Sequence, residues 1–257
     1  MASQKLSQYN FPVKLMQLKT DTGLKTTSFG VVRTDTKKVI GVVGSNYRYI
    51  PHKKVIDKIE NSLPISVASK KIEIAKGGAV MIARYDTLKI EPAVIRKNDV
   101  INFRVEIVNS YDGTYPVLMR LAAMRVVCEN GMIIPKSLVS LSFKHTSGAD
   151  ILNARKLFNE KLVLFTKAQD IWKKWSETVA KKAKIDEFFK RNLSYKAEDQ
   201  IMSKFVADKD DSVWGLYNAL TYYITHKLDS RIKSDLPVKR FRMRHYEEEA
   251  FYRFNWN

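Results

Sequence analysis

The sequence predicts an α+β fold in which an antiparallel β-sheet in the N-terminal half packs against long helices in the C-terminal half. Between about residues 26 and 144, apolar residues mostly recur at every second position and turn dipeptides separate the runs, which is the pattern of antiparallel strands. After Ser147-Gly148 the apolar residues recur with the 3.6-residue period of a helix. We therefore expect an N-terminal arm at residues 1–25, a core of sheet and helices at 26–230, and a basic helical extension at 231–257.

The first half should consist of short strands with one helix among them. In chain order, we expect strands at residues 29–33 and 39–43, a helix at 53–61, and strands at 65–75, 79–85, 99–108 and 117–127. Gly77-Gly78 joins the third and fourth strands in a hairpin, because glycine tolerates the positive φ that such turns require. Residues 99–108 alternate most clearly between apolar and polar side chains, which indicates one buried and one polar face. Residues 117–127 are apolar on both faces and should form a central strand that is covered on each side.

The second half should be helical. The expected helices cover residues 149–192, either as one helix or as two with a break near Thr166-Lys167, then 197–207, 212–228, and an amphipathic stretch that follows Pro237 and reaches Phe254. A stripe of large apolar residues that includes Trp172 and Trp175 marks the buried side of the first helix. Asp211-Ser212 is expected to cap the helix at 212–228, because a short polar side chain accepts hydrogen bonds from the free backbone N–H groups of a first turn.

The composition is strongly basic. The chain of 257 residues has 45 Lys and Arg against 27 Asp and Glu, a formal net charge of +18 and a pI of about 9.8. Such a surface attracts polyanions, and nucleic acid is the first partner to consider, although ribosome-associated and membrane-surface proteins share this excess. The 12 Tyr, 12 Phe and 4 Trp add rings on which the bases of single strands stack. The composition therefore favours binding of single-stranded nucleic acid.

Several classes of site and of protein are not expected. Cys128 is the single cysteine, which excludes an internal disulfide framework and a zinc site of several thiolates, and favours the cytoplasm. The N-terminus is polar, and no run approaches the ~18 apolar residues of a membrane span. The four histidines lack the spacing of metal ligands, and the chain has no Gly-x-x-x-x-Gly-Lys-Ser/Thr loop for phosphates. We therefore expect no metal, no cofactor and no membrane partner.

Four arginines on predicted strands are the main candidates for contacts with nucleic acid. They are Arg84, Arg104, Arg120 and Arg125, and Tyr47 adds a ring near the end of a strand. Guanidinium groups hydrogen-bond phosphates, and rings stack on bases. The alternative is that the rings belong to the core and that the arginines are solvated or pair with Glu73, Glu91 and Glu106. The sequence leaves both interpretations open.

The C-terminal run Lys239-Arg240-Phe241-Arg242-Met243-Arg244-His245-Tyr246 alternates cations with rings or a thioether. Two structures fit this run equally well. As a strand or an extended arm it would lie along a phosphate backbone. The acidic residues 247–249 that follow favour instead a helix with paired charges.

Two enzymatic activities are alternatives to binding. A nuclease needs clustered carboxylates to hold Mg²⁺. The available carboxylates are Asp57, Glu73, Asp86 and Glu106, and their spacing does not impose a shared site. A hydrolase would use Cys128 as nucleophile, His145 as base and Asp112, but Cys128 is expected in an apolar strand, where a buried thiol behaves as a small hydrophobe. The sequence therefore predicts a binding protein rather than an enzyme.

Several segments carry a resemblance to a known family. In chain order they are Gly41-Val42-Val43-Gly44-Ser45-Asn46-Tyr47 with Ile50-Pro51, Asn109-Ser110-Tyr111-Asp112-Gly113-Thr114, Arg125-Val126-Val127-Cys128-Glu129-Asn130-Gly131, His145-Thr146, and Val213-Trp214-Gly215-Leu216-Tyr217-Asn218-Ala219-Leu220-Thr221. In order and spacing, from about residue 29 to 230, they resemble the phage- and plasmid-like proteins that are grouped as a domain of unknown function. Where the family often has Thr after the cysteine, this chain has Glu129.

The resemblance implies a setting in mobile-element DNA metabolism. By analogy of fold it also implies a likeness to single-strand annealing recombinases, whose rings bind single strands in a basic groove. The family motif residues are Asn109, Asp112, Gly113, Cys128, Asn130 and Gly131, and they are expected to be structural, with tight turns at Asp112-Gly113 and Asn130-Gly131. Arg125 and His145 would hydrogen-bond across the sheet to Asn109 or Asp112, or would join Lys144 in contacting phosphate in a groove between sheet and helix.

Together these observations predict a single-stranded DNA-binding protein of phage or plasmid recombination or replication, with strand annealing as an extension of that role. It would act as a homo-oligomer in the cytoplasm of a bacterial host. Its contacts with the strand would come from Arg84, Arg104, Arg120, Arg125, Lys144, His145 and Tyr47. A nuclease or hydrolase, and a protein that binds a host factor through its basic surface, are the alternatives.

Overall fold

The computed structural model describes residues 8–62, 67–87, 91–134, 140–143, 154–229 and 233–257. The strands are β1 (Val13–Lys19), β2 (Lys25–Arg33), β3 (Lys38–Gly44), β4 (Val67–Ala75), β5 (Val80–Thr87), β6 (Ala93–Arg96), β7 (Asp99–Ser110), β8 (Val117–Arg125), β9 (Asn130–Ile133) and β10 (Ser140–Phe143). The helices are α2 (His52–Ser62), α3 (Ala154–Glu177), α4 (Lys182–Asn192), α5 (Tyr195–Asp208), α6 (Val213–Tyr222), α7 (Leu236–Met243) and α8 (Glu249–Arg253). Short 3₁₀ turns lie at η1 (Lys76–Gly78) and η4 (Lys233–Asp235), and π-helical turns lie at η3 (Tyr223–Lys227) and η5 (Arg244–Glu248).

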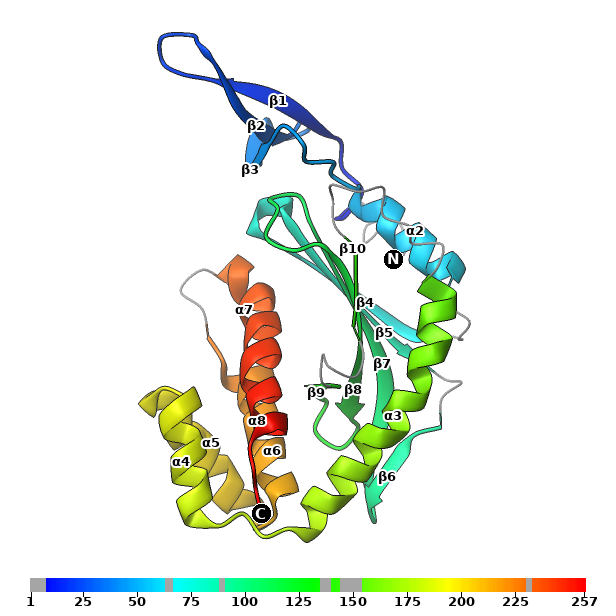
Figure 1. Cartoon of the computed structure of the whole chain (residues 1–257), viewed down its shortest axis with the longest axis vertical. Helices are drawn as coiled ribbons and strands as arrows, with labels where there is room; N and C mark the ends of the chain where they lie inside the picture. The colour runs from blue at the N-terminus through cyan, green and yellow to red at the C-terminus, as the bar shows by residue number, and fades with distance from the viewer. Residues whose placement is uncertain (1–7, 63–66, 88–90, 135–139, 144–153, 230–232) are drawn as a thin grey trace.

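Most strands belong to one antiparallel sheet, the main sheet, in the order β10-β8-β7-β5-β4 (Figure 1). β6 pairs with β7, and β9 pairs with β8. The first three strands form a separate antiparallel sheet in the order β1-β2-β3, which Figure 1 shows projecting from one end of the molecule. The α+β class predicted from the sequence is confirmed.

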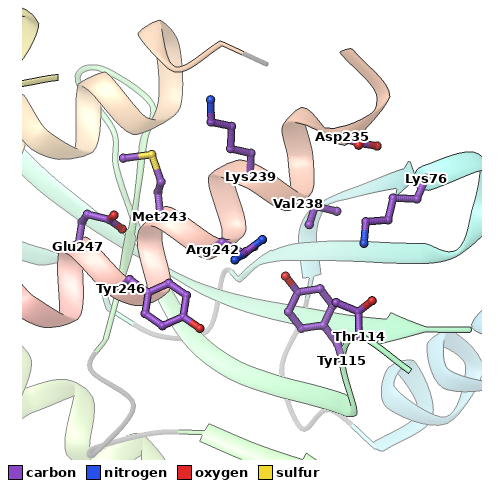
Figure 2. A pocket seen from close by; sticks show the side chains of 10 residues that line it. All are labelled: Lys76, Thr114, Tyr115, Asp235, Val238, Lys239, Arg242, Met243, Tyr246 and Glu247. Atoms are coloured by element: carbon purple, nitrogen blue, oxygen red, sulfur yellow. The ribbon is translucent and has the colours of Figure 1, made fainter. Parts of the chain in front are cut away.

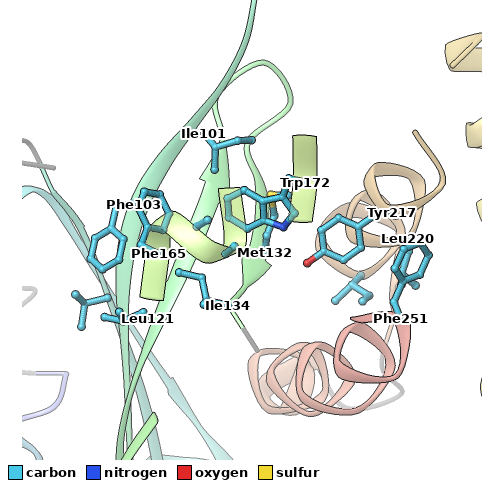
Figure 3. Close-up of a cluster of buried hydrophobic side chains, with 14 of the residues drawn as sticks. Ile101, Phe103, Leu121, Met132, Ile134, Phe165, Trp172, Tyr217, Leu220 and Phe251 are labelled. Atoms are coloured by element: carbon cyan, nitrogen blue, oxygen red, sulfur yellow. The ribbon is translucent and has the colours of Figure 1, made fainter. Parts of the chain in front are cut away.

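One face of the main sheet is apolar. Ile101, Phe103 and Val105 alternate along β7 on this face and are fully buried. They pack against α3, where Phe165 lies with its ring centroid 5.1 Å from that of Phe103, and Figure 3 shows the cluster continuing through Trp172 of the same helix. Burying a large apolar side chain contributes about 1.5–3 kcal/mol. This layer therefore holds the helices on the sheet.

The opposite face of the main sheet is charged and is crossed by α7. Side chains alternate between the two faces along a strand, so Arg104 and Glu106 of β7 point away from the apolar layer. Val238 and Phe241 of α7 pack on this second face, in a buried cluster with Ile82 of β5 and neighbouring apolar residues. The charged side chains therefore lie between a sheet and a helix.

The sheet of β1, β2 and β3 is attached to the main sheet by close contacts at its base. Phe11, Val31, Val43 and Tyr111 form a small buried cluster there. β3 comes so near the turn after β7 that a Cβ atom on Gly41 would lie 2.6 Å from Cα of Asp112. Only glycine fits at this position. β1 lies within the residues that the sequence indicated as an N-terminal arm.

The expected break in the first long helix is at a different place. α3 continues through Thr166-Lys167 to Glu177, and the break lies at residues 178–181. There the backbone pairs with the segment that precedes α6, because the N–H of Ala180 donates to the carbonyl of Asp211 at 2.8 Å and the N–H of Val213 donates to the carbonyl of Thr178 at 2.8 Å. These bonds satisfy groups that the end of a helix leaves free.

The central strand is shorter than expected. β8 ends at Arg125, and residues 126–129 form a turn in which Glu129 has a φ of 52°. Cys128 lies in this turn and is half-buried, so the prediction that it belongs to an apolar strand is wrong. Asn130-Gly131 begins β9 instead of forming the turn, because the positive φ falls on Glu129.

Other local predictions are confirmed. Gly113 has a φ of 75°, and Gly77 and Gly78 have φ of 66° and 115°, as expected of tight turns. Ser212 caps α6, because its Oγ accepts a hydrogen bond from the N–H of Gly215 at 3.0 Å.

Among the helices that the structure describes, none is long and apolar enough to span a membrane.

Candidate nucleic-acid interface

Strand register brings a row of charged side chains together on the polar face of the main sheet. Residues opposite one another in neighbouring strands point to the same face, and the register pairs Arg84 with Glu106 and Glu106 with Arg120. Nε of Arg84 donates to Oε1 of Glu106 at 2.8 Å, and Nε of Arg120 donates to Oε2 of Glu106 at 2.6 Å. Arg84 also forms an ion pair with Glu73 of β4. We call Glu73, Arg84, Glu106 and Arg120 the charged row.

The charged row keeps its carboxylates ionised. Burial acts to raise the pKa of Glu106, but Arg120 and Arg84 outweigh burial, and the pKa falls to about 2. Burial acts to lower the pKa of Arg84, but Glu106 and Glu73 reverse this effect, and the pKa rises. Opposite charges at contact distance favour the charged forms of both partners. The row is therefore balanced within itself, and any further cation beside it is in excess.

Two further arginines, on α7 and η5, lie beside this row. Arg244 of η5 is buried, and its Nη2 donates to Oγ1 of Thr225 at 3.0 Å. Burial, together with Arg84, lowers the pKa of Arg244 to about 10. Nε of Arg240 in α7 is buried and has no hydrogen-bond partner among the described residues. A buried guanidinium N–H without a partner is costly, so this group is ready to bind an anion.

A cleft of about 400 Å³ opens between the charged row and α7. Its cations are Lys71, Arg84, Arg104, Arg240 and Arg244, its carboxylates are Glu73 and Glu129, and Met124, Gly131, Thr225 and His226 complete the lining. Because the cations outnumber the carboxylates, the cleft attracts anions. Its volume is typical of a ligand site. Within the described ranges no group of three or more His, Cys, Asp or Glu side chains could hold a metal ion.

A comparison with known protein families identifies the family of this chain. The family described as Domain of unknown function (DUF932) matches residues 39–245, which is more than half of the sequence. The chain belongs to this family. No curated protein and no solved structure matches it.

In this DUF932 chain, the motif residue Gly131 lines the cleft, and its neighbour Asn130 contacts the lining residue His226. Nδ2 of Asn130 donates to the carbonyl of Asn218 in α6 at 3.2 Å, and Oδ1 of Asn130 lies 3.1 Å from Nε2 of His226. Gly131 leaves room for Arg244, because a Cβ atom at position 131 would lie 2.8 Å from its Nη2. The motif thus ties β9 to α6 and allows a guanidinium to lie against the backbone.

Arg125 does not make the contacts that the sequence suggested. Its Nε and Nη2 donate to the two carboxylate oxygens of Asp99 at 2.6 and 3.0 Å, and Asp99 also accepts a hydrogen bond from Nε1 of Trp214 at 2.7 Å. The expectation that Arg125 reaches Asn109 or Asp112 is wrong, because the register places Arg125 opposite Ile101, at the other end of β7. Arg125 therefore connects the sheet to α6, away from the cleft.

The motif residues Asn109 and Asp112 hold a different junction. Nδ2 of Asn109 donates to the carbonyl of Ile50 at 2.9 Å and lies 2.8 Å from Nδ1 of His52. Oδ1 of Asp112 accepts a hydrogen bond from the N–H of Thr114 at 2.9 Å, which supports the turn at Gly113. The contacts of Asn109 join the end of β7 to the start of α2, and the contact of Asp112 stabilises the turn that follows β7.

The structure thus brings together some of the predicted site residues. Arg84 and Arg104 line the cleft, and Arg120 adjoins it through Glu106. Arg84 and Arg120 also form the pairs with Glu73 and Glu106 that the alternative interpretation expected. Tyr47 lies apart, at the base of the smaller sheet, where its hydroxyl donates to the carbonyl of Ser110 at 2.9 Å. Lys144 and His145 lie outside the described residues.

The two arginines that α7 and η5 contribute were not among the predicted site residues. Arg240 and Arg244 are four positions apart in the sequence, and this spacing places them on one side of a helix. The run from Lys239 to Tyr246 is helical, so its interpretation as a strand or an extended arm is wrong. The acidic residues that follow the run were the signal that favoured the helix.

Proposed function

We propose that this protein binds single-stranded DNA and that the cleft between the charged row and α7 holds the phosphates of the strand. The observation that carries the proposal is the excess of cations in the cleft. Arg240 takes part in no ion pair among the described residues, Nε of Arg244 lies 3.8 Å from the carboxylate of Glu248, and both face a row whose own charges are already paired. Guanidinium groups bind phosphate through charge-assisted hydrogen bonds. The unpartnered Nε of Arg240 gives this surface a donor that a phosphate oxygen would satisfy.

The size of the cleft supports a single strand over a duplex. Its volume of about 400 Å³ suits a nucleotide and its phosphates. A protein that binds duplex DNA instead follows the grooves of the duplex, which are about 6–12 Å wide. Single strands are commonly held by grooves of cations with rings nearby. His226, at the edge of the cleft, lies against the ring of Tyr222 with centroids 4.8 Å apart, which supplies such a ring system.

The setting of this activity is part of the proposal. The resemblance to phage and plasmid proteins supports a role in DNA recombination or replication of a mobile element, in the cytoplasm of a bacterial host. The likeness to single-strand annealing recombinases supports annealing by a homo-oligomer, and it rests on analogy of fold.

Fluorescence anisotropy with labelled oligonucleotides tests the proposal. We expect the wild-type protein to bind a single strand more tightly than the matching duplex, and to speed pairing when the complementary strand is added. Arg240→Ala should weaken single-strand binding about tenfold, which corresponds to about 1.4 kcal/mol, because it removes a charged donor to phosphate.

Arg48→Ala is the matched control, since it also removes one guanidinium, but from an exposed position where the side chain donates to the backbone carbonyls of Ser45 and Tyr47. Equal binding of single strand and duplex, or equal losses in the two variants, would contradict the proposal. In that case capture of one host protein that resists nuclease treatment, or turnover of DNA, would favour the alternative functions.

A further inference from the structure

A second cleft lies on the other side of α7. It has a volume of about 400 Å³, and its lining includes Lys76, Tyr115, Lys239, Arg242, Tyr246 and Glu247 (Figure 2). A helix turns once in 3.6 residues, so Arg242 points away from the side that carries Arg240 and Arg244. The two clefts share no lining residue. This second cleft is therefore a separate candidate site, which we call the tyrosine cleft.

Two aromatic rings flank the tyrosine cleft. Figure 2 shows Tyr115 and Tyr246 on either side of Arg242. Tyr115 is held in place, because its ring meets the edge of Phe241 at 5.3 Å between centroids and its N–H donates to Oγ of Ser110 at 3.0 Å. Tyr246 is 61% exposed. A fixed ring and an exposed ring offer a planar ligand two surfaces for stacking.

Cations lie beside these rings. Arg242 is exposed and takes part in no ion pair within the part of the chain that the structure describes. Lys76 reaches the same cleft from η1 and is only loosely paired, since its Nζ lies 3.4 Å from Oδ2 of Asp112. Both groups are available to a phosphate, which prefers fixed cationic donors.

Glu247 adds an unmet hydrogen-bonding group to the wall. Its Oε2 is buried and has no hydrogen-bond partner among the described residues. Burial raises the pKa of Glu247 to about 7, although its own backbone N–H and Arg242 oppose this rise. A buried carboxyl oxygen without a partner is unfavourable, and the amino or ring N–H groups of a nucleobase would supply the missing bond.

We infer that the tyrosine cleft binds a nucleoside phosphate, with the base between Tyr115 and Tyr246, its polar edge on Glu247, and its phosphate on Arg242 and Lys76. The ligand is either a free nucleotide or one nucleotide of a bound strand. The inference does not require the proposed function, because the cleft between the charged row and α7 contributes none of these residues.

Isothermal titration calorimetry with adenosine 5′-monophosphate and cytidine 5′-monophosphate tests the inference, with adenosine and inorganic phosphate as separate probes. We expect a nucleotide to bind at least tenfold more tightly than either half of it alone. Tyr246→Ala should weaken binding about tenfold, because a base–ring stack contributes about 1–3 kcal/mol. Tyr195→Ala, which removes a ring that is 85% exposed on α5, should leave binding unchanged.

The source of the ligand follows from a parallel titration with a labelled oligonucleotide. If Tyr246→Ala weakens binding of the mononucleotide, the ligand is a free nucleotide. If it weakens only binding of the oligonucleotide, and Tyr195→Ala does not, the ligand is a nucleotide within a strand.

Two results would overturn the inference. One is that no nucleotide binds and Tyr246→Ala has no effect on binding of the oligonucleotide. The other is that inorganic phosphate binds as tightly as the nucleotide. If Arg240→Ala weakens binding of the oligonucleotide and Tyr246→Ala does not, the proposed function stands and the nucleotide site in the tyrosine cleft is rejected.

Discussion

Two buried glutamates show how direct partners decide the charge of a residue. Two arginines bind Glu106 directly, and its pKa falls to about 2. Glu248 is also buried, but it accepts hydrogen bonds from the N–H of Ile133 and the hydroxyl of Tyr217, both at 2.8 Å, and lies 3.8 Å from Nε of Arg244. Burial raises the pKa of Glu248 to about 7, although Arg244 and these bonds oppose the rise. Neutral donors and a distant cation do not offset full desolvation.

This difference predicts a pH dependence of stability. Between its ordinary pKa of 4.5 and the folded-state value of about 7, Glu248 keeps its proton in the folded chain and loses it in the unfolded chain. The free energy of unfolding therefore falls as the pH rises through this window and is constant with respect to Glu248 above it. Glu248→Gln removes this fall, by on the order of a few kcal/mol, and retains an oxygen acceptor for Ile133.

Urea unfolding of both proteins at pH 5 and pH 8 measures the effect. The expected result is that the variant loses less stability than the wild type between the two pH values. Identical losses would show that Glu248 is already ionised in the folded protein at pH 5.

At the scale of elements, β3 and the turn after β7 are held together by an approach that needs glycine. A Cβ atom on Gly41 would lie 2.6 Å from Cα of Asp112, which is backbone and cannot rotate away. We therefore predict that Gly41→Ala lowers the free energy of unfolding by about 1–3 kcal/mol, as overpacking of a tight contact does. Gly44→Ala in the same strand is the matched control, because no atom lies within 4 Å of a Cβ at that position. The urea midpoints of the two variants give the comparison, and equal midpoints would rule out the close contact.

Elements whose pattern is local were predictable from the sequence. The alternation in β7 gave one apolar and one charged face, and Ser212 gave the start of α6, because both depend on residues within a few positions. The position of the break between α3 and α4 was not predictable from the helical period of the apolar residues. It depends on hydrogen bonds to Asp211 and Val213, which are distant in the sequence.

The candidate site was predictable only in part, for the same reason. Arg84, Arg104 and Arg120 were selected because they lie on strands. Which arginine meets which carboxylate depends on register across β4, β5, β7 and β8, and register depends on the apolar faces and connecting turns of all four strands together. Arg240 and Arg244 become part of the site because α7 and η5 lie on the sheet, more than 100 residues after β8 begins.

Over the whole molecule, the basic residues that give the net charge of +18 are not equally available to bind anions. The arginines of the main sheet are paired with carboxylates, namely Glu73, Asp86, Asp99, Glu106 and Asp210. The cations that remain available in the two clefts come chiefly from α7 and η5, which cross the charged face. Binding of a polyanion is therefore expected at this face of the main sheet rather than over the whole surface.

The salt dependence of single-strand binding tests this account most directly. Each phosphate that a cation neutralises in a single strand contributes about 0.7 to the slope of the logarithm of the binding constant against the logarithm of salt concentration. Titrations of one labelled oligonucleotide at several salt concentrations should give a steep negative slope for the wild type and for Arg48→Ala, and a slope shallower by about 0.7 for Arg240→Ala. Slopes that are the same for all three proteins would contradict the claim that the cleft beneath α7 holds phosphate.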